Sequence, residues 1–302
     1  MLPALEGYAA ALLGSLDEAS LATVVADLEA VEETVLGRGD LRAVLADTSL
    51  SGPVRAAVLA DLLGSKVDAV TVRLLLFAAR VAPAQEVARS FAELALVALR
   101  LSEVGAATPG SLGLLEARRR VGGFADAVLE DMATAEFATV EGELFGWART
   151  IEGSDDLRRL LTDRDSPVAD RVAVTETLLG PHAAPTTLRV ARYVVIGGRP
   201  RDVVGTLDFL VDHVARARDW RVARVHSARS LAASVRDALS TSLTTLTGHT
   251  VELQVAVEPD LLGGVLVEVG DLRLDATMRG RLESLRDSVA SGHFHSSYAP
   301  ND

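Results

Sequence analysis

Only a few residues in this chain of 302 have the types and spacing that a chemical step would need. Gly263, Gly264 and Gly270 could form a phosphate-binding loop, but they match neither the Gly-x-Gly-x-x-Gly spacing nor the Gly-Lys-Ser/Thr ending of such loops. His293 and His295 could share a metal ion, yet two histidines in a polar terminal segment are more often incidental. We therefore expect no cofactor and no metal.

Nucleophilic chemistry is equally hard to assign. The chain has no cysteine and only 6 histidines, so thiolate chemistry, cysteine-held zinc or iron, and a Ser-His-Asp set all lack support. His226 stands alone in a predicted strand, where a structural role is the better interpretation. Asp155 and Asp156 have no further carboxylates at ligand spacing, so we interpret them as a helix cap. These observations predict a protein that is not an enzyme.

The charged clusters have structural interpretations. Arg118, Arg119 and Arg120 could bind an anion, but we predict a solvated helix face instead. The Arg-Gly-Asp tripeptide at 38–40 resembles an adhesion motif, and an interhelical loop that ends in a helix cap explains it better. The net charge of -12 argues against nucleic acid or an anionic membrane surface as the main partner.

Membrane insertion is not expected either. No apolar run reaches the ~20 residues that cross a bilayer. The N-terminal segment lacks the basic region of a signal peptide. We therefore expect a cytoplasmic protein without direct membrane insertion.

The first hundred residues have the apolar periodicity of helices and no strand pattern. Val54, Val58 and Leu62 recur every fourth residue after a helix start at 51–53, Ser-Gly-Pro. Pro83 opens a last helix that runs to about residue 101. About six short helices in this length predict a helical bundle.

The bundle is then repeated at a spacing of 116 residues. Between Asp40 and Arg73, 13 of 34 positions are identical to the residues 116 further on, without a gap. The matches include Asp-Leu-Arg (40–42) and Leu-Leu-Gly (62–64). Helical periodicity could match leucine with leucine by chance, but not glycine, aspartate and arginine in the same register. The sequence therefore predicts a duplicated helical domain.

The spacing of the apolar residues changes after about residue 218, where strand-like alternation appears beside the helical pattern. Residues 220–227 begin a strand, although their alternation is imperfect. Ser230 can cap a helix that ends at Gly248. Residues 251–257 then alternate as a half-buried strand.

The last elements surround a pair of glycines. Gly263-Gly264 lets another backbone approach closely before the strand 265–269. A Gly270-Asp271 turn then leads into a return strand. Asp275 or Thr277 can cap a helix whose apolar stripe is Met278, Leu282, Leu285 and Val289.

The predicted fold is therefore mainly α: two tandem six-helix bundles, an internal duplication, followed by a small α/β C-terminal domain with the order β-α-β-β-β-α. The expected boundaries are 1–105 for copy one, 112–218 for copy two and 219–290 for the C-terminal domain, with a flexible tail at 291–302.

Two sets of residues carry a family resemblance. The C-terminal set is Val251-x-Leu253, Val257-Glu258, Leu261, Gly263-Gly264, Val267, Gly270-Asp271, Asp275 and Arg281-Leu282. The N-terminal set is Tyr8-Ala9-x-Ala11-Leu12, with Arg80 near the end of the fifth helix. Together they resemble the delta subunit of F-type ATP synthase, the oligomycin-sensitivity-conferring protein family. The duplication departs from the usual single helical domain and resembles the longer form associated with actinobacteria.

The resemblance implies a role at the top of the peripheral stalk, where the family resists the torque of the rotor. It implies binding of the helical domain to the N-termini of alpha subunits, and of the C-terminal domain to subunit b. The beta subunit is a further candidate partner. It also implies a non-catalytic, peripheral protein at the cytoplasmic face of the cell membrane.

The resemblance also implies candidate site residues. For the alpha interface, between the first and fifth helices, these are Tyr8, Ala11, Leu74 and Leu75 in copy one, and Phe124, Ala127, Val190 and Ala191 in copy two. Each could equally be a simple core residue. For subunit b they are Gly263, Gly264, Gly270, Asp271, Asp275, Arg281 and Leu282. The alternative function, from another class, is a helical-repeat adaptor or regulatory scaffold unrelated to ATP synthase.

Overall fold

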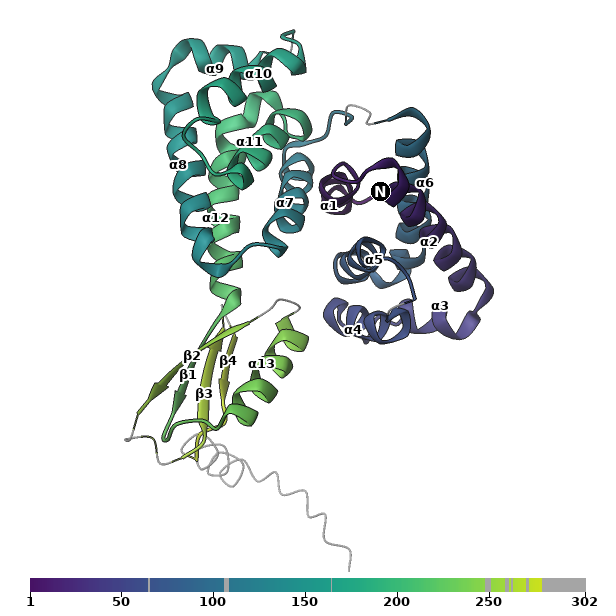
Figure 1. Cartoon of the computed structure of the whole chain (residues 1–302), viewed down its shortest axis with the longest axis vertical. Coiled ribbons are helices and arrows are strands. Elements are labelled where there is room, and N and C mark those ends of the chain that lie inside the picture. Colours follow the sequence, from purple (N-terminus) through teal and green to yellow (C-terminus); the bar gives the residue numbers. More distant parts are fainter. Residues whose placement is uncertain are drawn as a thin grey trace, which may run out of the picture. The chain divides into compact units, whose positions relative to one another are not determined.

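A computed structural model describes residues 1–64, 66–105, 109–163, 165–247, 251–258, 261, 263–269 and 272–278. The described chain is mainly helical, with a small sheet near the C-terminal end (Figure 1), which confirms the predicted fold class. It divides into two units, Met1–Ala215 and Arg216–Asp302. The predicted C-terminal helix and tail lie outside the described residues, apart from Met278.

Copy one begins the first unit. Its helices are α1 (Pro3–Leu13), α2 (Glu18–Gly37), α3 (Gly39–Leu45), α4 (Gly52–Leu63), α5 (Ala69–Val81), the 3-10 turn η1 (Ala84–Glu86) and α6 (Val87–Val104). Asp17 caps α2 by accepting a hydrogen bond from the Ser20 amide at 2.8 Å. Pro83 precedes η1, so the last helix begins at Val87, four residues later than a start at Pro83 would predict.

Copy two repeats this order, with one additional 3-10 turn between its first two helices. Its helices are α7 (Leu114–Glu130), η2 (Thr134–Glu136), α8 (Phe137–Gly153), α9 (Asp155–Thr162), α10 (Val168–Leu179), α11 (Pro185–Gly197), η3 (Pro200–Asp202) and α12 (Val203–Arg221). The prediction that Asp155 and Asp156 cap a helix is wrong. The Ser154 hydroxyl caps α9, and the two aspartates pair with Arg158 and Arg159 within its first turns.

The 116-residue register extends to side-chain contacts in the core. Tyr8 stacks on Phe77 in copy one, and the equivalent Phe124 stacks on Tyr193 in copy two, both with ring centroids 3.9 Å apart. The equivalent pairs Thr71–Asp27 and Thr187–Glu143 are hydrogen-bonded as well. The two copies therefore share their core packing as well as their helix order.

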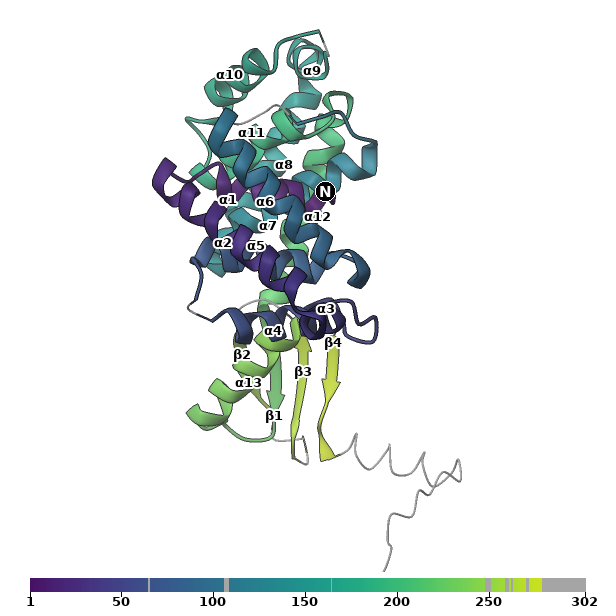
Figure 2. The ribbon, with the colours of Figure 1, turned by 90° about the vertical axis from the view of Figure 1, so that its right-hand side faces the viewer.

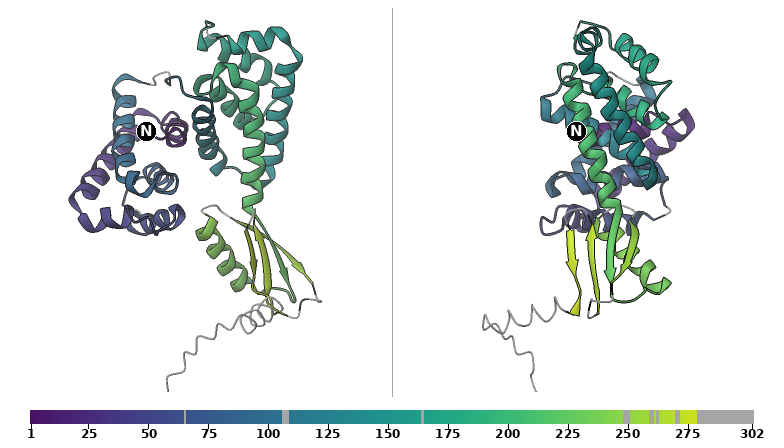
Figure 3. Two further views of the ribbon diagram at one scale, coloured as in Figure 1. Left: turned by 180° about the vertical axis from the view of Figure 1, so that it is seen from behind. Right: turned by 90° about the vertical axis from the view of Figure 1, so that its left-hand side faces the viewer.

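The second unit contains β1 (Val222–Ser227), α13 (Ala233–Thr247), β2 (Glu252–Val257), β3 (Val265–Val269) and β4 (Leu272–Asp275). The sheet order is β2-β1-β3-β4; β1 runs parallel to β2, and the other two pairs are antiparallel. Figure 3 shows these strands from two further sides. Leu243 of α13 joins a core that includes Val225, Val251 and Val267.

Two predicted boundaries in this region are wrong. The strand begins at Val222 and not at Trp220, because α12 continues through Arg221 before the chain becomes extended. The helix begins at Ala233 and not after Ser230, because its first backbone bonds go to the Ala232 carbonyl, from the Val235 and Arg236 amides. Both differences are local, and they leave the order β-α-β-β-β unchanged.

Candidate functional site

The two helical copies contact each other through their equivalent first helices. α1 and α7 lie side by side in Figures 1 and 2 and pack closely. A Cβ atom added at Gly7 would lie 1.8 Å from the Arg120 carbonyl oxygen, and one added at Gly123 would lie 1.9 Å from the Ala4 carbonyl oxygen. These pairs are related by the 116-residue register, so the crossing is pseudo-two-fold. The missing side chains allow the backbones to approach.

Ionic groups lie on one side of this crossing. The Tyr8 hydroxyl donates to Glu130 at 2.5 Å, and Arg73 binds both Glu130 and Asp131 at 3.0 Å. Arg80 lies over the Phe77 ring and approaches Glu130 at 3.5 Å. Burial, with the nearby Glu130 carboxylate as a smaller cause, raises the pKa of Tyr8 above its usual value, so the phenol remains a hydrogen-bond donor.

Arg120 forms a separate set of hydrogen bonds between the two copies. Its Nε donates to the Gly197 carbonyl at 2.7 Å, and its Nη1 donates to Glu6 at 3.2 Å and to the Gly110 carbonyl at 3.0 Å. The residue therefore connects α7 to α1, to the end of α11 and to the linker between the copies. Only 2% of it is exposed, so the predicted solvated face is wrong here.

A sequence signal for this burial exists. Arg120 shares a helical face with Phe124 and Ala127, at spacings of four and seven, whereas Arg119 does not. Arg118 is also held, by Asp202 at 2.8 Å, and only Arg119 of the three is exposed. The signal is therefore the spacing from Arg120 to the apolar residues of the next two turns, and the run of three arginines alone does not contain it.

The eight candidate residues for an alpha interface are all buried. Each is at most 8% exposed, in the bundle cores or under the contact between α1 and α7: Tyr8, Ala11, Leu74, Leu75, Phe124, Ala127, Val190 and Ala191. With the copies packed as they are, these side chains offer no open surface. Their role in binding a partner stays a prediction.

The C-terminal candidates meet at the start of β3. Gly263 and Gly264 have φ angles of 140° and 84°, and a Cβ at Gly264 would lie 2.3 Å from the Ala276 carbonyl oxygen. This confirms the predicted close backbone approach at Gly264, whereas, among the described residues, a Cβ at Gly263 would meet only the Met278 side chain, at 3.3 Å. Asp275 accepts from the Thr277 amide and hydroxyl, which lowers the pKa of its carboxyl. Gly270, Asp271, Arg281 and Leu282 lie outside the described residues.

Replacing Gly264 with alanine should destabilise the sheet by about 1–3 kcal/mol, because the new Cβ adds a backbone clash to an unfavourable φ. Gly105→Ala is the matched control, since Gly105 has a similar φ of 80° but nothing within 4 Å of the added Cβ. Hydrogen exchange of the β3 and β4 amides should accelerate in the first variant only. Equal local destabilisation around both glycines would show that φ alone matters.

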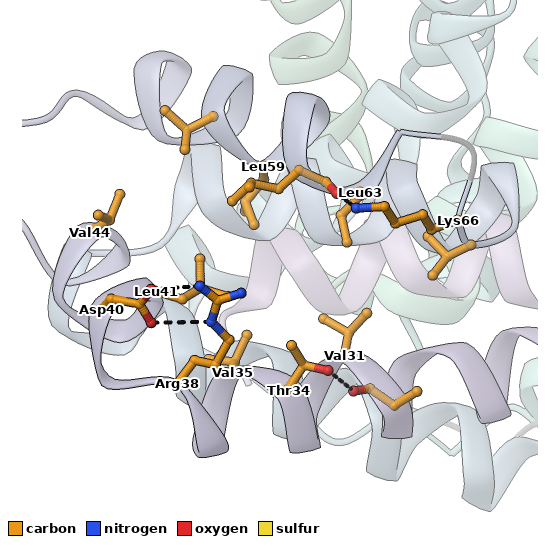
Figure 4. A pocket seen from close by; sticks show the side chains of 14 residues that line it. Val31, Thr34, Val35, Arg38, Asp40, Leu41, Val44, Leu59, Leu63 and Lys66 are labelled. Atoms are coloured by element: carbon orange, nitrogen blue, oxygen red, sulfur yellow. Dashed lines mark hydrogen bonds and ion pairs between the residues drawn. The ribbon is translucent and has the colours of Figure 1, made fainter.

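An open apolar groove lies on copy one between α2, α3 and α4 (Figure 4). Its volume is about 520 Å³, and its apolar lining includes Val31, Val35, Val44, Leu59, Leu62 and Leu63. The Arg38–Asp40 ion pair, at 2.6 Å, and Lys66 are the charged groups among its lining residues. The interhelical loop predicted for residues 38–40 is wrong, because only Arg38 separates α2 from α3, and Gly39 and Asp40 already belong to α3, whose start has no side-chain cap.

Copy two differs at this place. Trp147 stands where copy one has Val31, and Ile151 stands where copy one has Val35; the tryptophan is only 4% exposed. Valine is much smaller than tryptophan, so copy one has less side-chain volume at this position than copy two. Leu62 and its equivalent Leu178 are similarly exposed, at 44% and 47%. The two leucines therefore differ in the residues around them and not in their exposure.

The described residues offer no group of three or more histidine and acidic side chains placed to hold a metal ion. Among the described helices, none combines the length and apolar character needed to cross a bilayer. The described chain thus consists of two linked helical bundles, one of which carries an open apolar groove, and a small α/β unit.

Comparisons with known proteins identify the family. The family model of the ATP synthase delta (OSCP) subunit matches residues 5–109 and 122–289, so the chain belongs to the ATP synthase delta (OSCP) family. The ATP synthase subunit delta of Nocardia farcinica is 33% identical over 287 residues, covering 94% of this chain and 95% of that protein. The subunits of Salinispora tropica and Salinispora arenicola are 32% and 30% identical, each covering 91% of this chain and 90% of theirs.

Proposed function

We propose that this chain is a peripheral-stalk subunit of an F-type ATP synthase, which links the catalytic head to subunit b and resists the torque of the rotor. The observation that carries the proposal is that the family match extends through both helical copies and into the C-terminal unit. Relatives named ATP synthase subunit delta are similar over almost the whole chain.

In this role the chain has no catalytic step of its own. It acts at the cytoplasmic face of the cell membrane as a peripheral part of the complex. Its partners are the N-terminal helices of alpha subunits and subunit b, with the beta subunit as a further contact. Binding of an alpha helix at Phe124 and Val190 requires the surrounding helices to move, because these side chains are buried.

We assign the apolar groove of copy one to a stalk helix of the subunit b type. The groove is open without any rearrangement, and its walls are aliphatic, which suits the apolar stripe of an amphipathic helix. Lys66 lines the groove, and the exposed carboxylates of Glu33 and Asp61 are adjacent in sequence to the lining residues Thr34 and Leu62, so residues of both charges beside that stripe would find a partner. The C-terminal unit then binds the end of subunit b.

Leu62→Asp should weaken rebinding of the chain to membranes stripped of it by at least about tenfold, because a carboxylate in an apolar contact costs more than about 1.4 kcal/mol. Coupled ATP synthesis should fall with occupancy. Leu178→Asp is the matched control, since this equivalent leucine is equally exposed but does not line the groove.

Both variants should fold, because the leucines are on the surface. If wild-type chain fails to restore coupling, the stalk proposal is lost. If it restores coupling and Leu62→Asp binds as well as Leu178→Asp, the groove is not the contact. Crosslinking from position 62 is a separate experiment that identifies the subunit bound in the groove. A crosslink to alpha instead of b would reverse the assignment.

A further inference from the structure

Copy two contains a pocket that is smaller than the groove of copy one, and three arginines are among its lining residues. It measures about 300 Å³ and lies between the linker, the start of α10 and the end of α11. Arg120 enters it from α7, Arg171 from α10, and Arg199 from the segment before η3. Among the described residues that line it, none is acidic.

Arg171 is the unusual member of this set. It is only 4% exposed, and its Nε and Nη1 atoms are buried without a hydrogen-bond partner in the described chain. Burial lowers the pKa of this guanidinium, with Asp163 acting weakly in the opposite direction. An arginine nevertheless stays charged at physiological pH, so a buried charge remains here with only the weak influence of Asp163 and with two donors that form no hydrogen bond to the described residues. Such a group is costly unless something neutralises it.

The equivalent arginine of copy one shows how the fold can satisfy this group. Arg55 is 6% exposed, and it donates from Nη1 to the Leu50 carbonyl at 2.6 Å and from Nη2 to the Ala82 carbonyl at 2.9 Å. Only its Nε lacks a partner. In copy two the equivalent positions are Ser166 and Gly198, and Arg171 bonds to neither carbonyl. Within the described chain, an unbonded Nε is therefore common to both copies, and the unbonded Nη1 of Arg171 is specific to copy two.

The other two arginines differ in how much of their binding capacity is used. Arg120 is committed to Gly197, Gly110 and Glu6, which leaves it as a source of positive charge at the pocket wall. Arg199 is half-buried. The Glu6 and Asp163 carboxylates lie outside the lining, and Glu6 is paired with Arg120, so Arg171 and Arg199 contribute most of the positive charge of the pocket.

We propose that this pocket binds a small oxyanion of the phosphate type, with Arg171 and Arg199 as its direct ligands. The planar guanidinium fork matches two phosphate oxygens and forms short, charge-assisted hydrogen bonds. The volume admits a free phosphate ion or the phosphoryl end of a larger molecule. Because Arg120 joins this pocket to Glu6 of copy one and to the linker, occupancy also stabilises the contact between the copies.

The test is calorimetric titration of the whole chain with inorganic phosphate at constant ionic strength, together with thermal unfolding in phosphate and in chloride. Wild-type chain should bind phosphate saturably and unfold at a temperature several degrees higher in its presence. Arg171→Gln should bind at least tenfold more weakly and lose the phosphate-dependent shift. Arg55→Gln is the matched control and should keep both responses.

Two further comparisons separate a binding role from a structural one. In chloride, Arg55→Gln should unfold at a lower temperature than wild type, whereas Arg171→Gln should not, because it removes an uncompensated charge. Arg199→Gln, at a partly exposed site, should fold normally and weaken phosphate binding. Titration with ADP competing against phosphate shows whether a phosphoryl group can serve as the source. The proposal would be overturned if wild-type chain did not bind phosphate saturably, or if Arg171→Gln bound phosphate as tightly as wild type.

Discussion

Gly7→Ala is expected to destabilise the Met1–Ala215 unit by about 3 kcal/mol, near the upper end of what overpacking usually costs. The new Cβ would lie 1.8 Å from the Arg120 carbonyl oxygen and 2.9 Å from the Phe124 amide nitrogen, both of which are backbone atoms of α7. Side-chain rotation cannot relieve this clash, so the two helices must separate. Urea denaturation monitored by circular dichroism measures the loss.

The pseudo-two-fold geometry supplies a second variant and a control. Gly123→Ala should have a comparable effect, because its Cβ would lie 1.9 Å from the Ala4 carbonyl oxygen. Gly142→Ala, inside α8 with nothing within 4 Å, should instead stabilise by about 0.4–1 kcal/mol through helix propensity and a less flexible unfolded chain. A Gly7 variant as stable as the Gly142 variant would disprove the close crossing of α1 and α7.

Arg120→Met is expected to cost about 3–5 kcal/mol, as is typical when one partner of a buried ionic group is removed. The change removes the donors of the Gly197 and Gly110 carbonyls and leaves Glu6 without its cation, while methionine replaces most of the buried volume. The free energy of unfolding of the first unit, from urea titration, is the measurement.

Arg119→Met is the matched control, because it removes the same charge from the neighbouring, exposed residue. Its effect should remain within about 0.5 kcal/mol, as for most surface substitutions. If the two variants were equally stable, the buried network at Arg120 would contribute nothing. If only Arg119→Met destabilised the chain, the assignment of the helical faces would be reversed.

The sequence by itself determined the order of the elements and the duplication. Helix starts such as residues 51–53, and the alternation at 265–269, depend on backbone preferences and burial periods that act within a few residues. The 116-residue register holds in the structure down to the Tyr8–Phe77 and Phe124–Tyr193 stacks. The close approach at Gly264 was predictable because only glycine tolerates it at a positive φ.

Only the tertiary structure decided which faces are covered and which remain open. Periodicity shows that Arg120, Phe124 and Ala127 share a face of α7, but it cannot show that α1 packs on that face and buries a guanidinium there. The groove of copy one and the free donors of Arg171 likewise depend on neighbours distant in sequence. Equivalent arginines in one repeat register differ because carbonyls from other segments reach Arg55 and not Arg171.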